Sequence, residues 1–499
     1  MFPRTRTLFT GMGAKAPSCA LRTQITLIER STTRGALLRG SRSISILSHD
    51  KAVQNGDDFH ALMIGAGYVS FIITVLGSWC VESYPFHSPV FVQASWTMKP
   101  ESVADRLAAI LAFHDYELTT GFFISGPWNI SSRLEKRLGP RLKVDAVIDI
   151  NGPRAETALT EKRKSFVHEA YANTVVLPDV EEFKRRISIG EAQEPRAIFV
   201  ATPPIFRGGL GSQNNLEIKL NELFPNAAIF LEKPVATGVP AEQSIGEAKA
   251  VGAMLATQHN APVSVGYVLR YLNAVREMKK IIEENNLTIM ATNARYVTAY
   301  ELAIKTDWWN KSIMQGPIIE QGTHICDLSR YFGGDVNVET ICAHALEAHE
   351  KPGQLSKRNF DESVIPDDLR IPRATSASWK YESGAVGTML HATALHGRDY
   401  AIELEVYADG YQLILSDPFG TPALHVRKPG SDVLEVYPTP GDDPYQSEID
   451  VFIDAIEGKP DAKILCGYED AAKTYEMTWA IRNSSEEWTR KLSRRYGRA

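Results

Sequence analysis

Short apolar runs alternate with amphipathic stretches along residues 58–268. An apolar run bounded by glycine, proline or polar residues is typical of a strand buried on both faces, whereas the stretches between follow the 3.6-residue period of helices. The strands are expected within residues 61–67, 143–150, 196–204, 227–234 and 263–268, and the helices at residues 126–139, 156–169, 179–186, 215–223 and 241–259. This alternation predicts an α/β domain built on a parallel sheet.

The pattern changes after this domain, over residues 269–490. Several strand-like runs follow one another with few helices between them, which favours antiparallel pairing. The strands are expected at residues 289–300, 338–344, 375–381, 385–393, 402–408 and 411–415, and the helices at residues 271–285, 316–332, 445–458 and 468–483. The second domain is therefore predicted to be an α/β domain with a largely antiparallel sheet.

The first predicted strand runs into the glycine-rich turn Gly65-Ala66-Gly67. In a Rossmann dinucleotide-binding domain a helix begins directly after such a turn, because its N-terminal N–H groups face the pyrophosphate. Here residues 68–125 separate the turn from the helix that begins at Gly126. This segment has 7 charged residues in 58, about half the charge density of the whole chain. We interpret it as foreign to the fold, either a translated intron or a genuine surface insertion.

The predicted helix at residues 316–332 carries a candidate general base. Glu320, His324 and Asp327 recur at i, i+4 and i+7, so a regular helix would place them on one face. Two carboxylates, one turn away on each side, would fix the tautomer and the pKa of the imidazole. The alternative is a surface network without catalytic function.

A second motif, Phe230-Leu-Glu-Lys-Pro-Val-Ala236, lies at the end of a predicted strand. Together with the histidine helix it resembles the glucose–fructose oxidoreductase/inositol dehydrogenase (Gfo/Idh/MocA) family. The signatures of that family are a Glu-Lys-Pro after a Rossmann strand and a Gly-Gly-x-x-x-Asp-x-Gly-x-His-x-x-Asp helix. The resemblance covers residues 61–67 and 126–485, and it implies a Rossmann domain followed by a substrate and oligomerisation domain.

The resemblance implies catalytic roles for residues of both motifs. Lys233 would lie beside the nicotinamide and stabilise the alkoxide that develops at the reacting hydroxyl. His324 would be the general base, or the acid in the reverse direction. Glu320 stands where the family usually has Asp, and it keeps a carboxylate that is one methylene longer. Asp327 matches the trailing acid, and a structural role on the helix is its alternative.

The resemblance also implies an NAD or NADP site and no metal. Asp149, at the end of the second strand, would hold the adenosine ribose, which favours NAD because a carboxylate repels a 2′-phosphate. Arg154 lies close enough to affect this preference. The residues expected to bind the cofactor are Gly65, Ala66, Gly67, Gly126, Asp149, Thr202, Pro203, Glu232 and Lys233.

The function expected from the resemblance is NAD(P)-dependent hydride transfer between nicotinamide and a secondary alcohol of a sugar, polyol or dihydrodiol. The alternative is a non-catalytic, dinucleotide-binding sensor of the same fold. A homo-oligomer is expected, with no nucleic-acid or membrane partner. Residues that could line the substrate pocket, or instead belong to the core and surface, are Trp308, Trp309, Tyr267 and Arg270.

Composition adds a targeting hypothesis. The net charge is −6 over 499 residues, but residues 1–48 contain eight basic residues and one acidic residue. A basic segment rich in Arg, Ser and Thr is typical of a mitochondrial transit peptide, so the mitochondrial matrix is the expected location. The alternative is that this segment is a disordered tail and that the protein is cytoplasmic. The acidic remainder argues against nucleic-acid binding. The five cysteines form no C-x-x-C pair, so neither a zinc site nor a disulfide framework is indicated.

Deleting residues 68–125 should raise both the thermal stability and the dinucleotide affinity of the protein. Joining Gly67 to Gly126 restores a short strand–turn–helix unit whose free N–H groups can meet the pyrophosphate. Thermal unfolding and dinucleotide titration of the full-length and deleted proteins test this. Loss of folding on deletion, or detection of peptides from this segment in the natively expressed protein, would overturn the interpretation.

Overall fold

The computed structural model describes residues 57–65, 130–301, 303, 306–358, 361–397 and 400–496. The expected transit peptide at residues 1–48 and the segment 68–125 lie outside the described residues. So do Ala66, Gly67 and Gly126, three of the residues expected to bind the cofactor.

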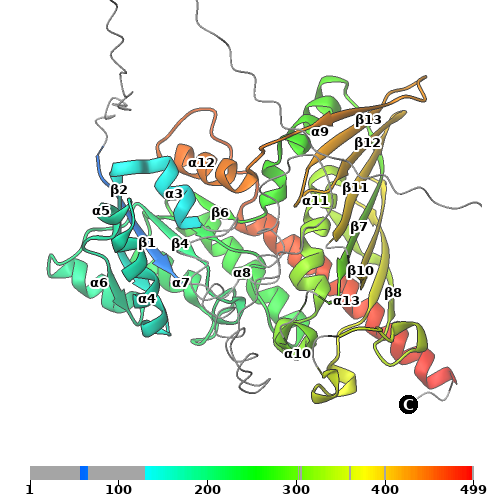
Figure 1. Ribbon diagram of the computed structural model, residues 1–499, viewed down its shortest axis with the longest axis horizontal. Helices are drawn as coiled ribbons and strands as arrows, with labels where there is room; N and C mark the ends of the chain where they lie inside the picture. Colours follow the sequence, from blue (N-terminus) through cyan, green and yellow to red (C-terminus); the bar gives the residue numbers. More distant parts are fainter. Residues whose placement is uncertain are drawn as a thin grey trace, which may run out of the picture. The chain divides into compact units, whose positions relative to one another are not determined.

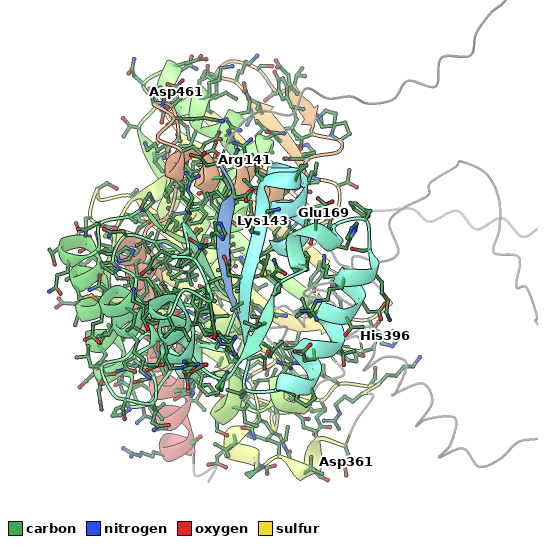
Figure 2. The ribbon with its side chains drawn as sticks, turned by 90° about the vertical axis from the view of Figure 1, so that its left-hand side faces the viewer. Arg141, Lys143, Glu169, Asp361, His396 and Asp461 are labelled. Atoms are coloured by element: carbon green, nitrogen blue, oxygen red, sulfur yellow. The ribbon has the colours of Figure 1, made fainter. Side chains whose placement is uncertain are left out.

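In the described part of the chain, the first domain contains a six-stranded sheet in the order β3-β2-β1-β4-β5-β6. Its strands are β1 (Phe59–Ile64), β2 (Leu142–Ile148), β3 (Val175–Leu177), β4 (Ala197–Val200), β5 (Ala228–Leu231) and β6 (Val263–Val265). All neighbouring strands pair in parallel. Figure 2 shows β1 beside β2, the strand on which Lys143 is labelled. The predicted parallel Rossmann sheet is confirmed, and β3 is a strand that the hydrophobic pattern did not indicate.

Helices bury both faces of this sheet. They are α3 (Ile130–Leu138), α4 (Gly152–Lys164), α5 (His168–Tyr171), α6 (Val180–Ser188), α7 (Leu216–Leu223) and α8 (Ala241–Gln258), joined by α12 (Pro444–Ile456) and α13 (Tyr468–Tyr496) from the end of the chain. Leu62 of β1 shares a core with residues of α6, α7, α8 and α13, whereas Met63 packs with α3, α4 and α12. Burial on both faces explains why β1 is a continuous apolar run.

The second sheet has eight strands in the described part of the chain, in the order β14-β13-β12-β11-β7-β10-β9-β8. The strands are β7 (Ile289–Ala299), β8 (Val336–Leu346), β9 (Ala374–Tyr381), β10 (Val386–Leu395), β11 (Tyr400–Ala408), β12 (Tyr411–Ser416), β13 (Ala423–Arg427) and β14 (Leu434–Pro438). Only β7 and β10 pair in parallel, so the expectation of a mostly antiparallel sheet is confirmed. The pattern missed β13 and β14, two short strands at one edge of the sheet.

Three further helices accompany this sheet: α9 (Asn273–Glu284), α10 (Lys311–Met314) and α11 (Thr323–Gly333). Residues Ile325 and Leu328 of α11 are buried in one core with strands β7 and β10. The long helix α13 contacts both α8 of the first domain and β8 of the second sheet (Figure 1). One helix is thereby shared by the two halves.

The predicted regular helix at residues 316–332 is wrong in its first part. Residues Ile318–Gly322 form a π-helix, and the α-helical geometry of α11 begins only at Thr323. A π-turn closes with i→i+5 hydrogen bonds, so it accommodates an extra residue in the turn and rotates the residues before it relative to those after it. Glu320 therefore does not keep the i, i+4 alignment with His324 that a regular helix would give.

None of the helices in the described part of the chain is both long and apolar enough to cross a membrane.

Candidate functional site

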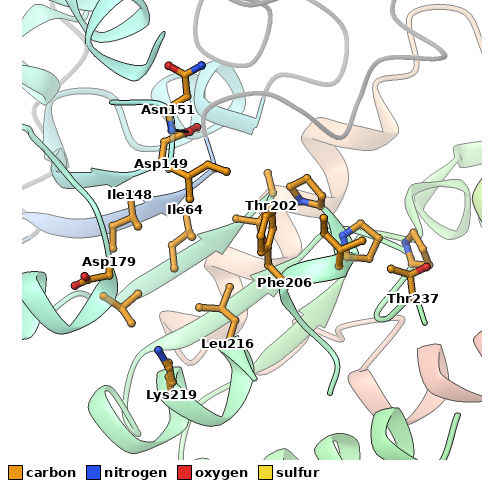
Figure 3. A pocket seen from close by; sticks show the side chains of 18 of the residues that line it. Ile64, Ile148, Asp149, Asn151, Asp179, Thr202, Phe206, Leu216, Lys219 and Thr237 are labelled. Carbon is orange, nitrogen blue, oxygen red and sulfur yellow. Dashed lines mark hydrogen bonds between the residues drawn. The ribbon is translucent and has the colours of Figure 1, made fainter. Parts of the chain in front are cut away.

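Four strands of the first sheet end at one cavity. Gly65 follows β1, Asp149 follows β2, Thr202 follows β4 and Lys233 follows β5. Because the strands are parallel, their carboxyl ends meet at the same edge of the sheet. A cavity of about 610 Å³ lies there, and each of these four residues lines it. Figure 3 shows Asp149 and Thr202 along this cavity. The volume is within the range of small-molecule and cofactor sites.

Gly65 allows the end of β1 to approach β4 closely. Its N–H donates to the carbonyl of Ile148 at 2.7 Å, and its φ is +88°. A Cβ at this position would lie 2.9 Å from the backbone nitrogen of Thr202. Any other residue would suffer both backbone strain and this clash, so the chain requires glycine at the first position of the turn.

Asp149 is buried and already hydrogen-bonded. One carboxylate oxygen accepts from the N–H of Asn151 at 2.7 Å, and the other lies 2.8 Å from a guanidinium nitrogen of Arg154. Asn151 in turn caps α4, with its side-chain oxygen accepting from the N–H of Arg154. The expected proximity of Arg154 to Asp149 is therefore observed as a direct ion pair at the edge of the cavity.

The turn after β4 and the end of β5 complete the cavity wall. The hydroxyl of Thr202 is buried and has no hydrogen-bond partner, and Pro203 also lines the cavity. Glu232, which was expected to bind the cofactor, is not among the residues that line this cavity, and its carboxylate lies beside Gly266. Burial raises the pKa of Glu232, and the charge of Lys233 opposes that rise.

These features fit a dinucleotide. The strand ends provide a glycine that permits close approach, an acidic group at the end of β2 and an unpaired hydroxyl at the end of β4. A ligand that offers a hydrogen-bond partner would satisfy the buried Thr202 hydroxyl.

Lys233 joins the first domain to the π-helix of the second. Its Nζ donates to the backbone carbonyl of Glu320 at 3.0 Å and lies 3.6 Å from the Glu320 carboxylate. The other carboxylate oxygen of Glu320 accepts from the indole Nε1 of Trp308 at 3.3 Å. Both Lys233 and Glu320 are buried and line the cavity. Lys233 and Glu320, two of the predicted catalytic residues, are thus in contact, and Trp308 contacts Glu320.

His324 is buried, and neither of its ring nitrogens has a hydrogen-bond partner. Its imidazole packs edge-on against Phe419, with ring centroids 5.4 Å apart. Burial, and then the charge of Lys233, hold the pKa of His324 well below its usual range. The imidazole is therefore neutral at physiological pH and can accept a proton.

The prediction that two carboxylates flank His324 is wrong for both acids. Glu320 is rotated away by the π-turn and pairs with Trp308 and Lys233. Asp327 is buried in a bidentate ion pair with Arg270, at 2.6 and 2.8 Å. Burial raises the pKa of Asp327, and the guanidinium of Arg270 acts against that rise.

The other residues considered for the substrate pocket divide between site and core. Trp308 touches Glu320, whereas Trp309 donates to the carbonyl of Ala303 and belongs to a small core cluster. Arg270 binds Asp327, and the hydroxyl of Tyr267 bonds that of Thr323. Phe419 was not singled out from the sequence, because it lies in the turn between β12 and β13, and β13 was not predicted.

Comparison with known proteins places this site in a family. The sequence profile of the oxidoreductase family with an NAD-binding Rossmann fold, Gfo/Idh/MocA, matches residues 125–267, and that of an oxidoreductase C-terminal domain matches residues 270–411. An uncharacterized protein of Schizosaccharomyces pombe is 42% identical over 71% of this chain and 86% of its own length. A second from the same yeast is 39% identical over 72% of this chain and 92% of its own.

The chain belongs to the Gfo/Idh/MocA family. Among solved structures, levoglucosan dehydrogenase in complex with NADH and levoglucosan has a TM-score of 0.56 at 15% identity, covering 86% of this chain and 98% of the other. A 3-ketoreductase from Actinomadura kijaniata in complex with NADP has a TM-score of 0.52 at 11% identity, with the same coverage. At 11–15% sequence identity, these similarities show a shared fold and no more. The resemblance to the Gfo/Idh/MocA family is thus confirmed, and the chain is an NAD(P)-dependent oxidoreductase by family.

In this Gfo/Idh/MocA protein, Asp327→Asn should lower the free energy of unfolding by about 3 kcal/mol, because it removes the buried carboxylate that pairs with Arg270 and leaves only the partly exposed Asp470. Urea unfolding measures the loss. As a control, Asp432→Asn should cost less than about 1 kcal/mol, since Asp432 and its partner Arg427 are both exposed to solvent. A direct chemical role for Asp327 would instead lower kcat by about 10²–10⁴ in the folded variant and contradict the structural assignment.

His324 should stay neutral when the pH falls to about 6, where an exposed histidine is mostly protonated. The reason is the burial and the nearby charge that depress its pKa. Lys233→Met removes that charge and should raise the pKa of His324. Nuclear magnetic resonance titration of histidine-labelled protein measures both, with His324→Gln to assign the signal. A wild-type His324 that titrates at or above its ordinary 6.5 would refute the assignment.

Proposed function

We propose that this protein transfers hydride between a nicotinamide dinucleotide and a secondary alcohol of a sugar, polyol or dihydrodiol. The observation that carries the proposal is the juxtaposition of the buried ammonium of Lys233, which bonds the backbone of Glu320, with the buried neutral imidazole of His324, on which the charge of that ammonium acts. Lys233 reaches the backbone of Glu320 from the first domain, and His324 lies one turn further along the same helical segment.

Lys233 and His324 have different roles in the proposed oxidation of the alcohol. Lys233 supplies positive charge for the oxygen on which negative charge develops, and a buried charge acts strongly because water does not screen it. His324 has two free ring nitrogens and accepts the hydroxyl proton. The dinucleotide, when bound, supplies the hydride acceptor. In the reverse direction His324 returns the proton to the carbonyl oxygen.

The carboxylate of Glu320 has a positioning role in this proposal. It lies 3.6 Å from the ammonium of Lys233 and is held by Trp308. Removing the carboxylate would leave Lys233 bonded to the backbone carbonyl of residue 320, and the ammonium would then be freer to move. The distant structural neighbours include a levoglucosan dehydrogenase and a UDP-N-acetylglucosamine 3-dehydrogenase, and a sugar-type substrate is compatible with those activities.

The central test is a screen of sugars, polyols and diols with both NAD and NADP, followed by Lys233→Met. Lys233→Met should lower kcat by about 10²–10³ while dinucleotide affinity changes little, because the ammonium acts mainly on charge that develops in the transition state. Steady-state kinetics and dinucleotide titration measure the two effects. Turnover at the wild-type rate in the variant would reject the role of Lys233. Tight dinucleotide binding without turnover of any alcohol would identify a sensor instead.

NAD should be preferred over NADP, because Asp149 presents a carboxylate at the end of β2, where the adenosine ribose binds. Arg154 reduces this preference by pairing with that carboxylate. Accordingly, Asp149→Ser should raise the affinity for NADP relative to NAD by about tenfold, and Arg154→Ala should lower it. Calorimetric titration with both dinucleotides measures the ratio. Shifts of the two variants in the same direction would contradict this assignment.

A further inference from the structure

The turn that follows β4 forms one wall of the cavity, and two buried side chains of opposite charge lie behind it. The turn runs from Thr202 to Gly208, and its residues 202–206 line the cavity (Figure 3). Arg207 and Glu217 are both 0% exposed, and neither lines the cavity. Arginine and glutamate are almost never fully buried unless they are paired. The partners of these two side chains therefore indicate what they do.

Each of the two side chains bonds one end of the turn. The Nε of Arg207 donates to the backbone carbonyl of Thr202 at 3.1 Å. The carboxylate of Glu217, in the first turn of α7, accepts from the backbone N–H of Gly208 at 2.8 Å. A hydrogen bond at each end restricts how far the backbone between them can move. The position of this cavity wall is therefore set by Arg207 and Glu217.

Both ends of the turn also pack closely against other parts of the site. A Cβ on Gly65 would lie 2.9 Å from the backbone nitrogen of Thr202. At the other end, the φ of Gly208 is +78°, and a Cβ there would lie 2.4 Å from the backbone carbonyl of Val235. Val235 follows Lys233 by two residues. A displacement of the turn would therefore change both the cavity and the surroundings of Lys233.

Stability alone does not explain the guanidinium of Arg207. Its two terminal nitrogens are buried and have no hydrogen-bond partner among the described residues, and unpaired buried donors destabilise a fold. Burial lowers the pKa of Arg207, and the charge of Glu217 acts against that fall. Buried opposite charges can often be replaced together by apolar residues of similar volume without loss of stability. The bond to Thr202 supplies a reason for Arg207 that stability does not.

We propose that Arg207 and Glu217 are positioning residues of the dinucleotide site, which hold the turn after β4 where it can contact the bound dinucleotide. This inference rests on the proposed function, because that function assigns the cavity to a dinucleotide. The hydroxyl of Thr202 has no partner in the described part of the protein, and the bond from Arg207 restrains the backbone that carries this hydroxyl. Both positioning residues act through the backbone of the turn, without contact to the dinucleotide.

Two variants separate positioning from stability. Arg207→Met/Glu217→Leu removes both charges and both bonds to the turn, so its Tm should stay close to that of the wild type. Its Kd for the dinucleotide should rise about tenfold or more, because the wall is no longer held. Glu217→Gln should have the opposite profile. Its Tm should fall, since Arg207 loses the counter-charge, but its amide oxygen still accepts from Gly208 and the Kd should change less than about threefold.

The readouts are thermal unfolding and fluorescence titration with NADH and NADPH. Lys162→Met/Glu135→Leu is the matched control. It removes a buried pair, 2.7 Å apart, that joins α4 to α3 and does not line the cavity. The dinucleotide Kd of this control should equal that of the wild type, whatever its Tm.

Several results would overturn the inference. An unchanged Kd in the folded double variant of Arg207 and Glu217 would show that the pair does not position the turn. A double variant that does not fold would show that the pair serves the fold. An equal loss of affinity in the control pair, or in Glu217→Gln, would show that the bonds to the turn are not the cause.

Failure of the proposed function has a different signature. Loss of dinucleotide affinity in the double variant, together with no turnover of any alcohol by the wild type, would support the positioning residues and reject the alcohol oxidation. A wild-type protein that binds neither NADH nor NADPH would reject both.

Discussion

The site depends on one hydrogen bond between the two halves of the chain, from the ammonium of Lys233 to the backbone carbonyl of Glu320. Lys233 is fixed at the end of β5, inside the dinucleotide-type sheet, and Glu320 belongs to the π-helix of the other half. Because His324 follows within the same helical segment, this bond also sets where the imidazole lies relative to the ammonium. A regular α-turn at residues 318–322 would change that relation.

The charges around this bond are arranged so that the imidazole stays neutral. Burial and then the charge of Lys233 disfavour its protonation. The two acids of the sequence motif bind other residues, Glu320 to Trp308 and Asp327 to Arg270. Asp327 is neutralised by Arg270, which also reaches Asp470 on α13. Arg330 connects α11 to the same aspartate. These ion pairs hold α11 against α13, the helix that contacts both domains, and so they stabilise the alignment of the two domains.

The sequence predicted the fold well and the site in part. Strands buried on both faces and long amphipathic helices have strong periodic signals, so the first sheet and most of the second followed from the pattern. Strands as short as β3, β13 and β14 carry too few residues for a period to be seen. The family resemblance assigned Lys233 and Glu320 to one site, but it did not predict that the two side chains contact each other. The predicted flanking of His324 by two carboxylates is not observed. For Glu320 the spacing argument assumed a regular helix, whereas the residue lies in a π-helix. For Asp327 it took no account of Arg270, a partner distant in the sequence.

Hydride transfer from the alcohol carbon to the nicotinamide can be followed by isotope transfer. A polyol that the enzyme oxidises is supplied with deuterium on its carbon atoms, and the reduced dinucleotide is isolated and examined by mass spectrometry and nuclear magnetic resonance. Deuterium is expected at C4 of the reduced nicotinamide, together with a slower rate than with the undeuterated polyol. Reduced dinucleotide without deuterium, or no reduced dinucleotide from any polyol, would contradict the proposed hydride transfer.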